Sequence, residues 1–308
     1  MTLRQTREDA RPEIHARPGR FEADAVLGVV AREWILYGQS WRATTFAAVV
    51  EPTLYLLCFG FGMGALIGTL AGYSYIDFLG TGIVAVSVMF QSMMPAVINT
   101  FIKRRFLHTY EGILATPIDV RELVTGEALW LALRSGVYGC VPLLVAIGFG
   151  LRPGPGMLLV PFIAFLAGFA FALFGIWISA VITSVRSMDY VFSGLFTPLF
   201  LVAGTFFPLT ELPDWVQSAA MVNPLYHAVE LIRGVVFGGL APVTALGHVA
   251  VLLAFIVLMW FLAGFQMRRR VVSSGGLPPA PPPSHAATRR RWAPSAARSS
   301  RARPPRSR

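Results

Sequence analysis

The chain has 308 residues, of which 55% are hydrophobic and 14% charged, and its mean hydropathy is +0.61. This composition excludes an ordinary soluble globular protein and is typical of a protein embedded in a membrane. The formal net charge of +10 comes from the C-terminal end, because residues 268–308 contain eleven arginines and no acidic residue.

The apolar residues gather into continuous runs of roughly 20 residues, about the length at which an α-helix crosses a 30 Å hydrocarbon core. Strands of a transmembrane barrel would alternate apolar and polar residues, and these runs do not. We therefore predict an all-α integral membrane protein with its membrane domain over residues 21–267. The six predicted spans cover about 45–69, 78–102, 124–150, 157–183, 190–207 and 243–266, and the fifth is short.

Residues 1–20 are predicted to be a flexible cytosolic N-terminus, and an amphipathic helix is predicted from Phe21 to Trp41. Apolar side chains recur at helical spacing on one side of this segment, and polar side chains lie on the other. With Trp34 and Trp41 at headgroup level, the helix is expected to lie along the inner membrane surface. The alternative is an extension of the first span. The apolar side comprises Val26, Val29, Val30, Trp34 and Tyr37, and the polar side Asp24, Arg32, Glu33 and Gln39.

Arginine and lysine are unevenly distributed among the connecting segments. Several arginines precede the first span, residues 70–77 contain none, and Lys103, Arg104 and Arg105 follow the second span. Basic residues favour the cytosolic side of a membrane. Six spans with both termini in the cytosol satisfy this bias.

The segment 103–117 is a basic, polar interruption between two predicted spans. After its three cations, Phe106, Tyr110, Ile113 and Leu114 fall at i, i+4, i+7 and i+8, which predicts one apolar face of a short helix over 105–115. Such a helix in a cytosolic loop either receives a partner protein or lies on the lipid headgroups. The residues of this segment alone leave both interpretations open.

The segment 208–242 is expected to form two helices that are too short to cross the membrane and too apolar for open water. A short helix is expected first. Asn223 followed by Pro224 then predicts the N-cap and first position of a second helix over Leu225–Phe237, which Gly238 is expected to end. We predict that these two helices dip back into the outer leaflet.

No motif in the sequence indicates catalysis or a metal centre. Cys58 and Cys140 lie within predicted spans, and the five histidines are scattered. His227 has an acidic neighbour at helical spacing, Glu230, and this pair favours a surface hydrogen bond over a metal site. The glycines at 60–68 lack the lysine of a phosphate-binding loop. The chain is therefore expected to bind no cofactor or metal and not to be an enzyme.

Few charged residues lie inside the predicted spans. Glu51 lies at the start of the first span, and Glu127 and Arg134 lie in the third. Because Glu127 and Arg134 are two helical turns apart, they share a face and could pair through other groups. Their place near the cytosolic side favours interfacial anchoring over a proton relay at mid-membrane.

Residues 268–308 are rich in proline and then in arginine, alanine and serine, which predicts a disordered cytosolic tail. Its arginines are expected to attract an anionic membrane surface. Nucleic-acid binding is not expected, because neither a folded module nor interleaved aromatic residues accompany the arginines.

Two segments carry a resemblance to a known family. Thr-Tyr-Glu-Gly-Ile-Leu-Ala-Thr-Pro at 109–117 and Asn-Pro-Leu-Tyr-His-Ala-Val-Glu-Leu-Ile-Arg at 223–233 resemble the two signature regions of ABC-2 type permeases. The resemblance is greatest to the nodulation-type lipo-oligosaccharide exporter permeases, and the daunorubicin-type drug exporter permeases are more distantly similar. It covers about 25–267, and the arginine-rich tail departs from the family.

The resemblance implies a half-transporter whose surface helix and first cytosolic loop rest on a separate ABC ATPase subunit, which binds ATP and Mg²⁺. It also implies a homodimer in the cytoplasmic (inner) membrane of a bacterium, in contact with lipid. The residues implied to couple to the ATPase are Arg105, Phe106, Tyr110, Glu111, Gly112, Ile113, Leu114, Ala115, Thr116 and Pro117, and Thr116, Pro117 and Asp119 would cap the next helix. The surface helix would contribute Arg32, Glu33 and Trp34, and the re-entrant signature comprises Asn223, Pro224, Tyr226, His227, Glu230 and Arg233.

Together these features favour the permease subunit of an ATP-driven exporter that moves an amphipathic glycolipid or lipo-oligosaccharide outward. Export of a hydrophobic drug is the alternative within the family. An integral-membrane enzyme acting on lipid-linked sugars would need a carboxylate or histidine cluster at a membrane face. An ion-coupled carrier would need charges near the midplane.

Overall fold

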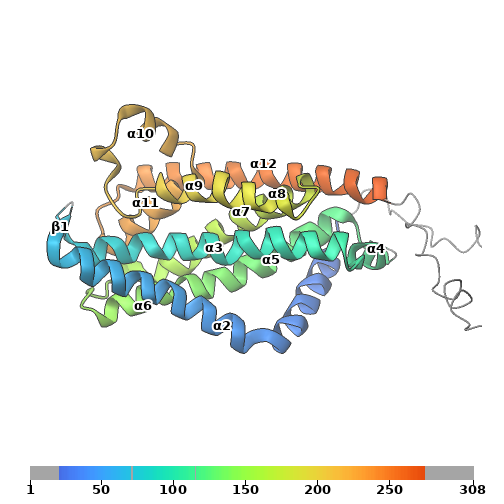
Figure 1. Ribbon diagram of the computed structural model, residues 1–308, viewed down its shortest axis with the longest axis horizontal. Helices are drawn as coiled ribbons and strands as arrows, with labels where there is room; N and C mark the ends of the chain where they lie inside the picture. The colour runs from blue at the N-terminus through green and yellow to red at the C-terminus, as the bar shows by residue number, and fades with distance from the viewer. Residues whose placement is uncertain (1–20, 71, 115, 275–308) are drawn as a thin grey trace, which may run out of the picture. The chain divides into compact units, whose positions relative to one another are not determined.

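The computed structural model describes residues 21–70, 72–114 and 116–274, which are almost entirely helical (Figure 1). The long helices are α2 (Ala23–Ile67), α3 (Tyr75–Arg105), α5 (Val120–Gly139), α7 (Val160–Val181) and α12 (Pro242–Ser274). The shorter ones are α4 (Thr109–Leu114), α6 (Val141–Gly148), α8 (Arg186–Val191), α9 (Thr197–Leu201), α10 (Asp214–Ala220) and α11 (Pro224–Phe237). Single turns form η1 (Pro155–Leu159), η2 (Phe192–Phe196) and η3 (Leu209–Glu211). Two short strands, β1 (Thr69–Leu70) and β2 (Tyr73–Ser74), pair antiparallel between α2 and α3.

Five helical segments of the described residues are long and apolar enough to cross a membrane. The prediction of an almost entirely α-helical membrane protein is therefore confirmed. The segments are Ala23–Ile67, Tyr75–Arg105, Val120–Gly148, Pro155–Val181 and Pro242–Val271.

The predicted span over 190–207 is not among these five segments. The chain there is helical only from α8 through α9, with the π-helical turn η2 between them, and residues 202–207 form turns. The helix is therefore shorter than the roughly 20 residues that a crossing needs. The hydropathy of the sequence does not indicate where this helix ends, because the residues after Leu201 remain largely apolar.

The predicted surface helix and first span form one continuous helix, α2, of 45 residues. Figure 1 shows that α2 bends, so that its N-terminal part points away from the direction of the longer remainder. The helix thus continues through the predicted boundary between the surface helix and the first span. This agrees with the alternative interpretation, in which the segment 21–41 extends the first span.

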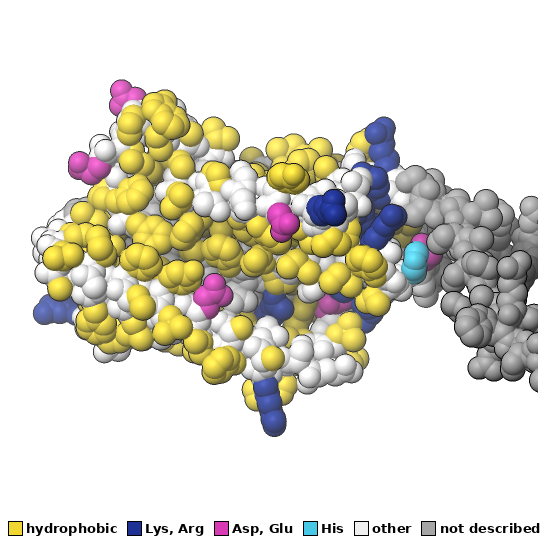
Figure 2. Space-filling view, viewed as in Figure 1, with side chains coloured by type: hydrophobic (Ala, Val, Ile, Leu, Met, Phe, Trp, Pro, Cys, Tyr) yellow, Lys and Arg dark blue, Asp and Glu magenta, His cyan; other side chains and the backbone are white. Residues whose placement is uncertain are grey.

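The helix α3 lies at the centre of the packing, against α2, α5, α7 and α11. In the most apolar 18-residue stretch of α3, 72% of the residues are buried inside the protein. In the corresponding stretches of α2 and α12, only 22% of the residues are buried. Figure 2 shows one face covered largely by hydrophobic side chains, with several basic side chains toward the end that holds α4. The apolar surfaces of α2 and α12 are therefore largely exposed on the single chain.

The two short helices predicted within 208–242 are present as α10 and α11. Asn223 is the N-cap of α11 and accepts a hydrogen bond from the Leu225 amide at 3.0 Å, and Pro224 is the first helical residue. Gly238 ends the helix in the left-handed conformation, with φ of 73°, which glycine adopts without a steric penalty. The helix packs against α3 and α7.

The last helix continues to Ser274, past the predicted start of the tail at 268. The predicted flexible residues 1–20, Ala115 and the remainder of the predicted tail lie outside the described residues.

Candidate functional site

The loop between α3 and α5 contains a helix shorter than the one predicted over 105–115. Arg105 is the last residue of α3, the chain turns at Phe106 and Leu107, and α4 begins only at Thr109. His108 has φ of 49°, a left-handed conformation that interrupts a right-handed helix. Phe106 therefore does not share a helical face with the residues of α4.

Within α4, the predicted apolar face points into the protein. The Tyr110 and Leu114 side chains are buried, with exposed fractions of 2% and 4%, whereas Phe106 is 60% exposed. The Tyr110 hydroxyl donates a hydrogen bond to the Glu127 carboxylate on α5. Burial, together with that carboxylate, raises the pKa of the Tyr110 hydroxyl well above its usual value, so Tyr110 remains a donor at neutral pH.

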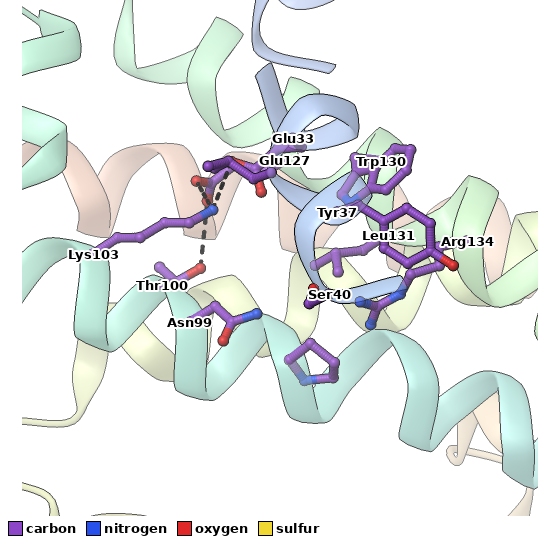
Figure 3. Close-up of a pocket in the computed structure, with 12 residues that line it drawn as sticks. Glu33, Tyr37, Ser40, Asn99, Thr100, Lys103, Glu127, Trp130, Leu131 and Arg134 are labelled. Carbon is purple, nitrogen blue, oxygen red and sulfur yellow. Dashed lines mark hydrogen bonds and ion pairs between the residues drawn. The ribbon is translucent and has the colours of Figure 1, made fainter. Parts of the chain in front are cut away.

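Glu127 belongs to a buried charge network that joins four helices. Its side chain is 4% exposed, and Oε1 accepts a hydrogen bond from Lys103 Nζ of α3 at 2.9 Å. Lys103 Nζ also donates to Glu33 Oε1 of α2 at 2.7 Å, so this ammonium group lies between two carboxylates (Figure 3). Thr100 contributes a further, longer hydrogen bond to Glu127 at 3.4 Å. We call Glu33, Lys103, Tyr110 and Glu127 the buried charge network.

Arg32 of α2, which lies beside the buried charge network, balances its charge. Arg32 Nη1 lies 2.7 Å from Glu33 Oε1, so two cations face the carboxylates of Glu33 and Glu127. Removing one partner from such a buried group leaves a charge without a counter-charge. The resulting loss of folding free energy is much larger than the net stabilisation that the intact pair provides. The network therefore constrains α2, α3, α4 and α5 to one arrangement.

The N-terminal part of α2 is held against α5 by close packing as well as by charge. The Trp34 and Tyr37 rings contact Trp130 edge-on, at centroid distances of 5.6 and 5.5 Å. Gly126 on α5 lacks a side chain where one would collide, because a Cβ there would lie 2.6 Å from Cβ of Val29. Glu33 is thus positioned by the docking of its own helix.

The three basic residues that end α3 have different environments. Lys103 belongs to the network, and Arg105 is exposed. Arg104 donates to the carbonyl oxygens of Ser179 and Ile182, at 2.7 and 3.2 Å, at the C-terminal end of α7. Cations at this end of a helix satisfy its last carbonyls and its negative dipole.

The residues after α4 lead into α5. Asp119 is the N-cap of α5, as expected, and its amide donates to the Glu122 carboxylate at 2.8 Å. Thr116 and Pro117 precede the cap in exposed positions, and the Thr116 hydroxyl donates to the Ile113 carbonyl at 2.5 Å. Glu122 also accepts from the Glu22 amide at 2.6 Å, which attaches the start of α2 to α5.

The outward surface of this loop includes Phe106 and residues next to the other three that the apolar periodicity selected. His108 Nδ1 lies 3.0 Å from Glu111 Oε1, and both side chains are exposed. Ile113 is half-buried and packs against the interior. The exposed residues of the segment are Arg105, Phe106, Leu107, His108, Glu111, Gly112, Thr116 and Pro117.

The second signature, on α11, forms a separate polar cluster. The predicted surface hydrogen bond between His227 and Glu230 is wrong, because His227 is buried and its Nδ1 lies 2.7 Å from Nδ1 of His248. Glu230 instead lies 3.5 Å from Arg233. The Arg233 side chain stacks 3.8 Å from the Phe78 ring. Within residues 21–70, 72–114 and 116–274, no group of three or more potential metal ligands occurs.

Sequence reasoning missed the buried charge network, although it singled out Glu127. Glu127 and Arg134 do share a face of α5 and line one cavity, but Arg134 donates to the Gln91 carbonyl at 2.8 Å. The signal available was the presence of Glu33, Lys103 and Glu127 in apolar surroundings, where charges require partners. Only the three-dimensional packing identifies which partners they have.

Comparisons with known proteins are consistent across most of the chain. The family described as ABC-2 type transporter matches residues 25–237. A protein named Nodulation protein J from Sinorhizobium fredii is 30% identical over 244 residues, which is 79% of this chain and 93% of that protein. Its namesake from Bradyrhizobium diazoefficiens is 34% identical over 75% of this chain and 89% of its own length. The Inner membrane transport permease YadH of Escherichia coli is 25% identical over 80% and 95%.

Proposed function

Because the chain belongs to the ABC-2 type transporter family, we propose that it is the membrane-spanning permease subunit of an ATP-driven exporter. Membership of this family makes it a transport subunit and not an enzyme, and implies partnership with an ABC ATPase. Five apolar helices agree with a multi-pass membrane protein. In this proposal ATP and Mg²⁺ bind to the separate ATPase subunit, and the chain itself carries no cofactor.

The observation that carries the proposal is the two-sided construction of the loop that contains α4. One side is exposed and presents Phe106, His108 and Glu111, a mixed apolar and charged surface suited to a protein partner. The other side is anchored, because Tyr110 donates to Glu127 inside the membrane domain. A partner bound to the exposed side is therefore connected to the interior through defined bonds.

The proposed mechanism follows from that connection. Displacement of α4 by a closing ATPase dimer pulls on Glu127 of α5 through Tyr110. Because Lys103 joins Glu127 to Glu33, the displacement extends to α3 and α2. A buried network resists the loss of single partners, so the helices respond by moving together rather than by separating.

Arg32, Glu33 and Trp34 have a supporting role in this proposal. Glu33 lies inside the network, whereas Arg32 is partly exposed and the Trp34 side chain is 64% exposed. Arg32 and Trp34 are therefore the residues of α2 that remain available to the ATPase, and Glu33 links this contact to Lys103.

The assembly that we propose is a homodimer of the chain with two ATPase subunits. Apolar residues on α2 and α12 are exposed along the membrane-crossing segments, where a second copy and lipid would cover them. In this proposal both termini and α4 lie in the cytosol, and α10 and α11 lie toward the outer leaflet as re-entrant helices. The sixth crossing that this topology requires is made by the short helical segment from α8 through α9 together with the turns of residues 202–207, which lead from the side of α4 toward α10 (Figure 1). The location is the cytoplasmic membrane of a bacterium, and the loop's basic residues agree with a cytosolic side.

The proposed substrate is an amphipathic glycolipid or lipo-oligosaccharide, moved outward. This assignment is supported by the resemblance to nodulation-type permeases and by relatives named Nodulation protein J. Export of a hydrophobic drug is the alternative within the same family.

Co-purification tests the proposal. The affinity-tagged chain is co-expressed with the ABC ATPase encoded nearest to it, extracted from membranes and analysed for bound ATPase and for ATP hydrolysis in lipid. We expect a stable complex in which the permease changes the hydrolysis rate. Recovery of the chain without any ATPase, together with transport driven by a pH or sodium gradient alone, would contradict the proposal.

A further inference from the structure

A cavity of about 190 Å³ lies beside the buried charge network, between α2, α3 and α5. Lys103 lies at one end, and Arg134 lies toward the other end, next to Tyr37 (Figure 3). Ser40 of α2 and Asn99 of α3 line it between these ends and are exposed. Charged, amide and hydroxyl groups thus converge on a space inside an otherwise apolar region.

The two cations of this cavity differ in how they are neutralised. Lys103 is shared between the carboxylates of Glu33 and Glu127. Arg134 has no carboxylate within ion-pair distance among residues 21–70, 72–114 and 116–274, and its Nη2 donates only to the neutral Gln91 carbonyl. Its Nε is buried and has no hydrogen-bond partner.

A guanidinium group in this position requires a counter-ion. Arginine stays protonated in proteins, and an unpaired buried charge within a membrane-crossing helix is costly. The two acids that line the cavity, Glu33 and Glu127, already form ion pairs with Arg32 and Lys103, and neither lies within ion-pair distance of Arg134. The unmet requirement is for an oxyanion that enters from outside the chain.

The surroundings of Arg134 indicate what kind of molecule carries that oxyanion. The Tyr37 and Tyr138 hydroxyls bond to each other, and Thr45 Oγ1 lies 2.5 Å from the Tyr138 hydroxyl, which joins α2 to α5 near Arg134. The cavity wall also includes Leu36, Pro95 and Leu131. The basic end of α3 places the cavity toward the inner leaflet in the proposed topology. A polar cavity with apolar walls at this depth suits a lipid headgroup.

We propose that the cavity binds the anionic headgroup of an amphiphile, a phosphate, sulfate or carboxylate carried on an acyl chain. Arg134 supplies the counter-charge through its guanidinium group, and Asn99 and Ser40 donate hydrogen bonds to the remaining oxygens. This inference rests on the proposed function only in taking the amphiphile to be the exported substrate, since the binding itself requires no ATPase.

The test is a binding measurement on the full chain in nanodiscs of phosphatidylcholine, without ATPase. The probes are dioctanoyl phosphatidylglycerol, dioctanoyl phosphatidylcholine and free glycerol phosphate. We expect phosphatidylglycerol to bind at least about 10-fold more tightly than either other probe. Equal binding of glycerol phosphate would overturn the assignment to an amphiphile, and equal binding of phosphatidylcholine would overturn the role of negative charge.

Two variants locate the site. Arg134→Gln is expected to weaken phosphatidylglycerol binding at least about 10-fold, with partial recovery in Arg134→Lys, which keeps the charge. Ser40→Trp fills the cavity without removing the bond from Arg134 to Gln91, and it is expected to weaken binding even if Arg134→Gln fails to fold. Arg152→Gln is the matched control, because Arg152 is an exposed loop residue, and this variant should bind phosphatidylglycerol as wild type does. Wild-type binding in a folded Arg134→Gln variant or in Ser40→Trp would overturn the proposal.

Discussion

Lys103 of α3 and Glu127 of α5 form a direct ion pair, with Nζ 2.9 Å from Oε1, between two helices that are apolar enough to cross a membrane. Their side chains are 14% and 4% exposed. The pair lies directly beneath the loop that contains α4, because Tyr110 donates to the same carboxylate. It is thus the point at which an external contact on that loop is connected to the packing of the long helices.

Removal of the shared cation should destabilise the protein more than removal of a whole pair. Lys103→Met leaves Glu127 buried without a positive partner, which costs roughly 3–5 kcal/mol. The double variant Lys103→Met/Glu127→Gln should cost less, because Glu33 retains Arg32 as a partner. Thermal unfolding midpoints of the purified variants, analysed as a double-mutant cycle, check this expectation. Strictly additive losses would show that the two side chains do not interact.

Gly126 is expected to be essential for the docking of α2 on α5. Gly126→Ala places a Cβ 2.6 Å from Cβ of Val29, an overpacking that costs about 1–3 kcal/mol. Val29→Ala should restore part of the loss by removing the colliding atoms. Gly28→Ala is the control, because a Cβ at that position meets nothing within 4 Å and alanine favours a helix. The unfolding midpoint should therefore fall for Gly126→Ala and stay or rise for Gly28→Ala.

The proposed orientation can be measured by thiol labelling. In a background with Cys58 and Cys140 replaced by serine, single cysteines are introduced for the exposed residues Leu107 and Trp215. A membrane-impermeant reagent added to intact spheroplasts should label position 215 and not position 107, which should react only after permeabilisation. The reverse pattern would invert the topology and place α4 outside the cytosol.

The exposed side of α4 is expected to determine ATPase binding. Glu111→Arg reverses an exposed charge without disturbing the interior, so it should reduce the amount of ATPase that co-purifies while the variant remains folded. Asp214→Arg makes a comparable acid-to-arginine change on α10, at an exposed site away from the loop, and should leave co-purification unchanged. Equal effects of the two changes would exclude a specific contact at Glu111.

Local chemistry in the sequence predicted several elements correctly. The N-cap at Asn223 with Pro224 after it and the helix end at Gly238 each depend on neighbouring residues only. The family resemblance implied a cap formed by Thr116, Pro117 and Asp119, and of these Asp119 is the N-cap of α5. Helical periodicity failed between Phe106 and Tyr110, because the backbone reversal at His108 cannot be recognised from the spacing of apolar side chains.

Long-range contacts were beyond such reasoning for a physical reason. Nothing adjacent to Tyr110 in the sequence indicates that its hydroxyl bonds to Glu127, since the partner is supplied by the packing of α4 on α5. The apolar run at 190–207 likewise predicted a span, whereas the helix ends at Leu201. Hydropathy depends only on which side chains are present. It does not indicate where the hydrogen bonding of the backbone changes from helix to turn.

Coupling through Tyr110 is tested most directly by the Tyr110→Phe variant in the reconstituted complex with the ATPase. This change removes one hydroxyl and its bond to Glu127 but keeps the ring and the exposed side of the loop. Tyr190→Phe, at an 80% exposed tyrosine, is the matched control. The measurement is the ratio of substrate exported to ATP hydrolysed.

We expect Tyr110→Phe to bind the ATPase as wild type does but to export about five-fold less substrate per ATP, whereas Tyr190→Phe should match wild type. An unchanged export ratio in Tyr110→Phe would show that the bond between Tyr110 and Glu127 does not couple the loop to the membrane helices.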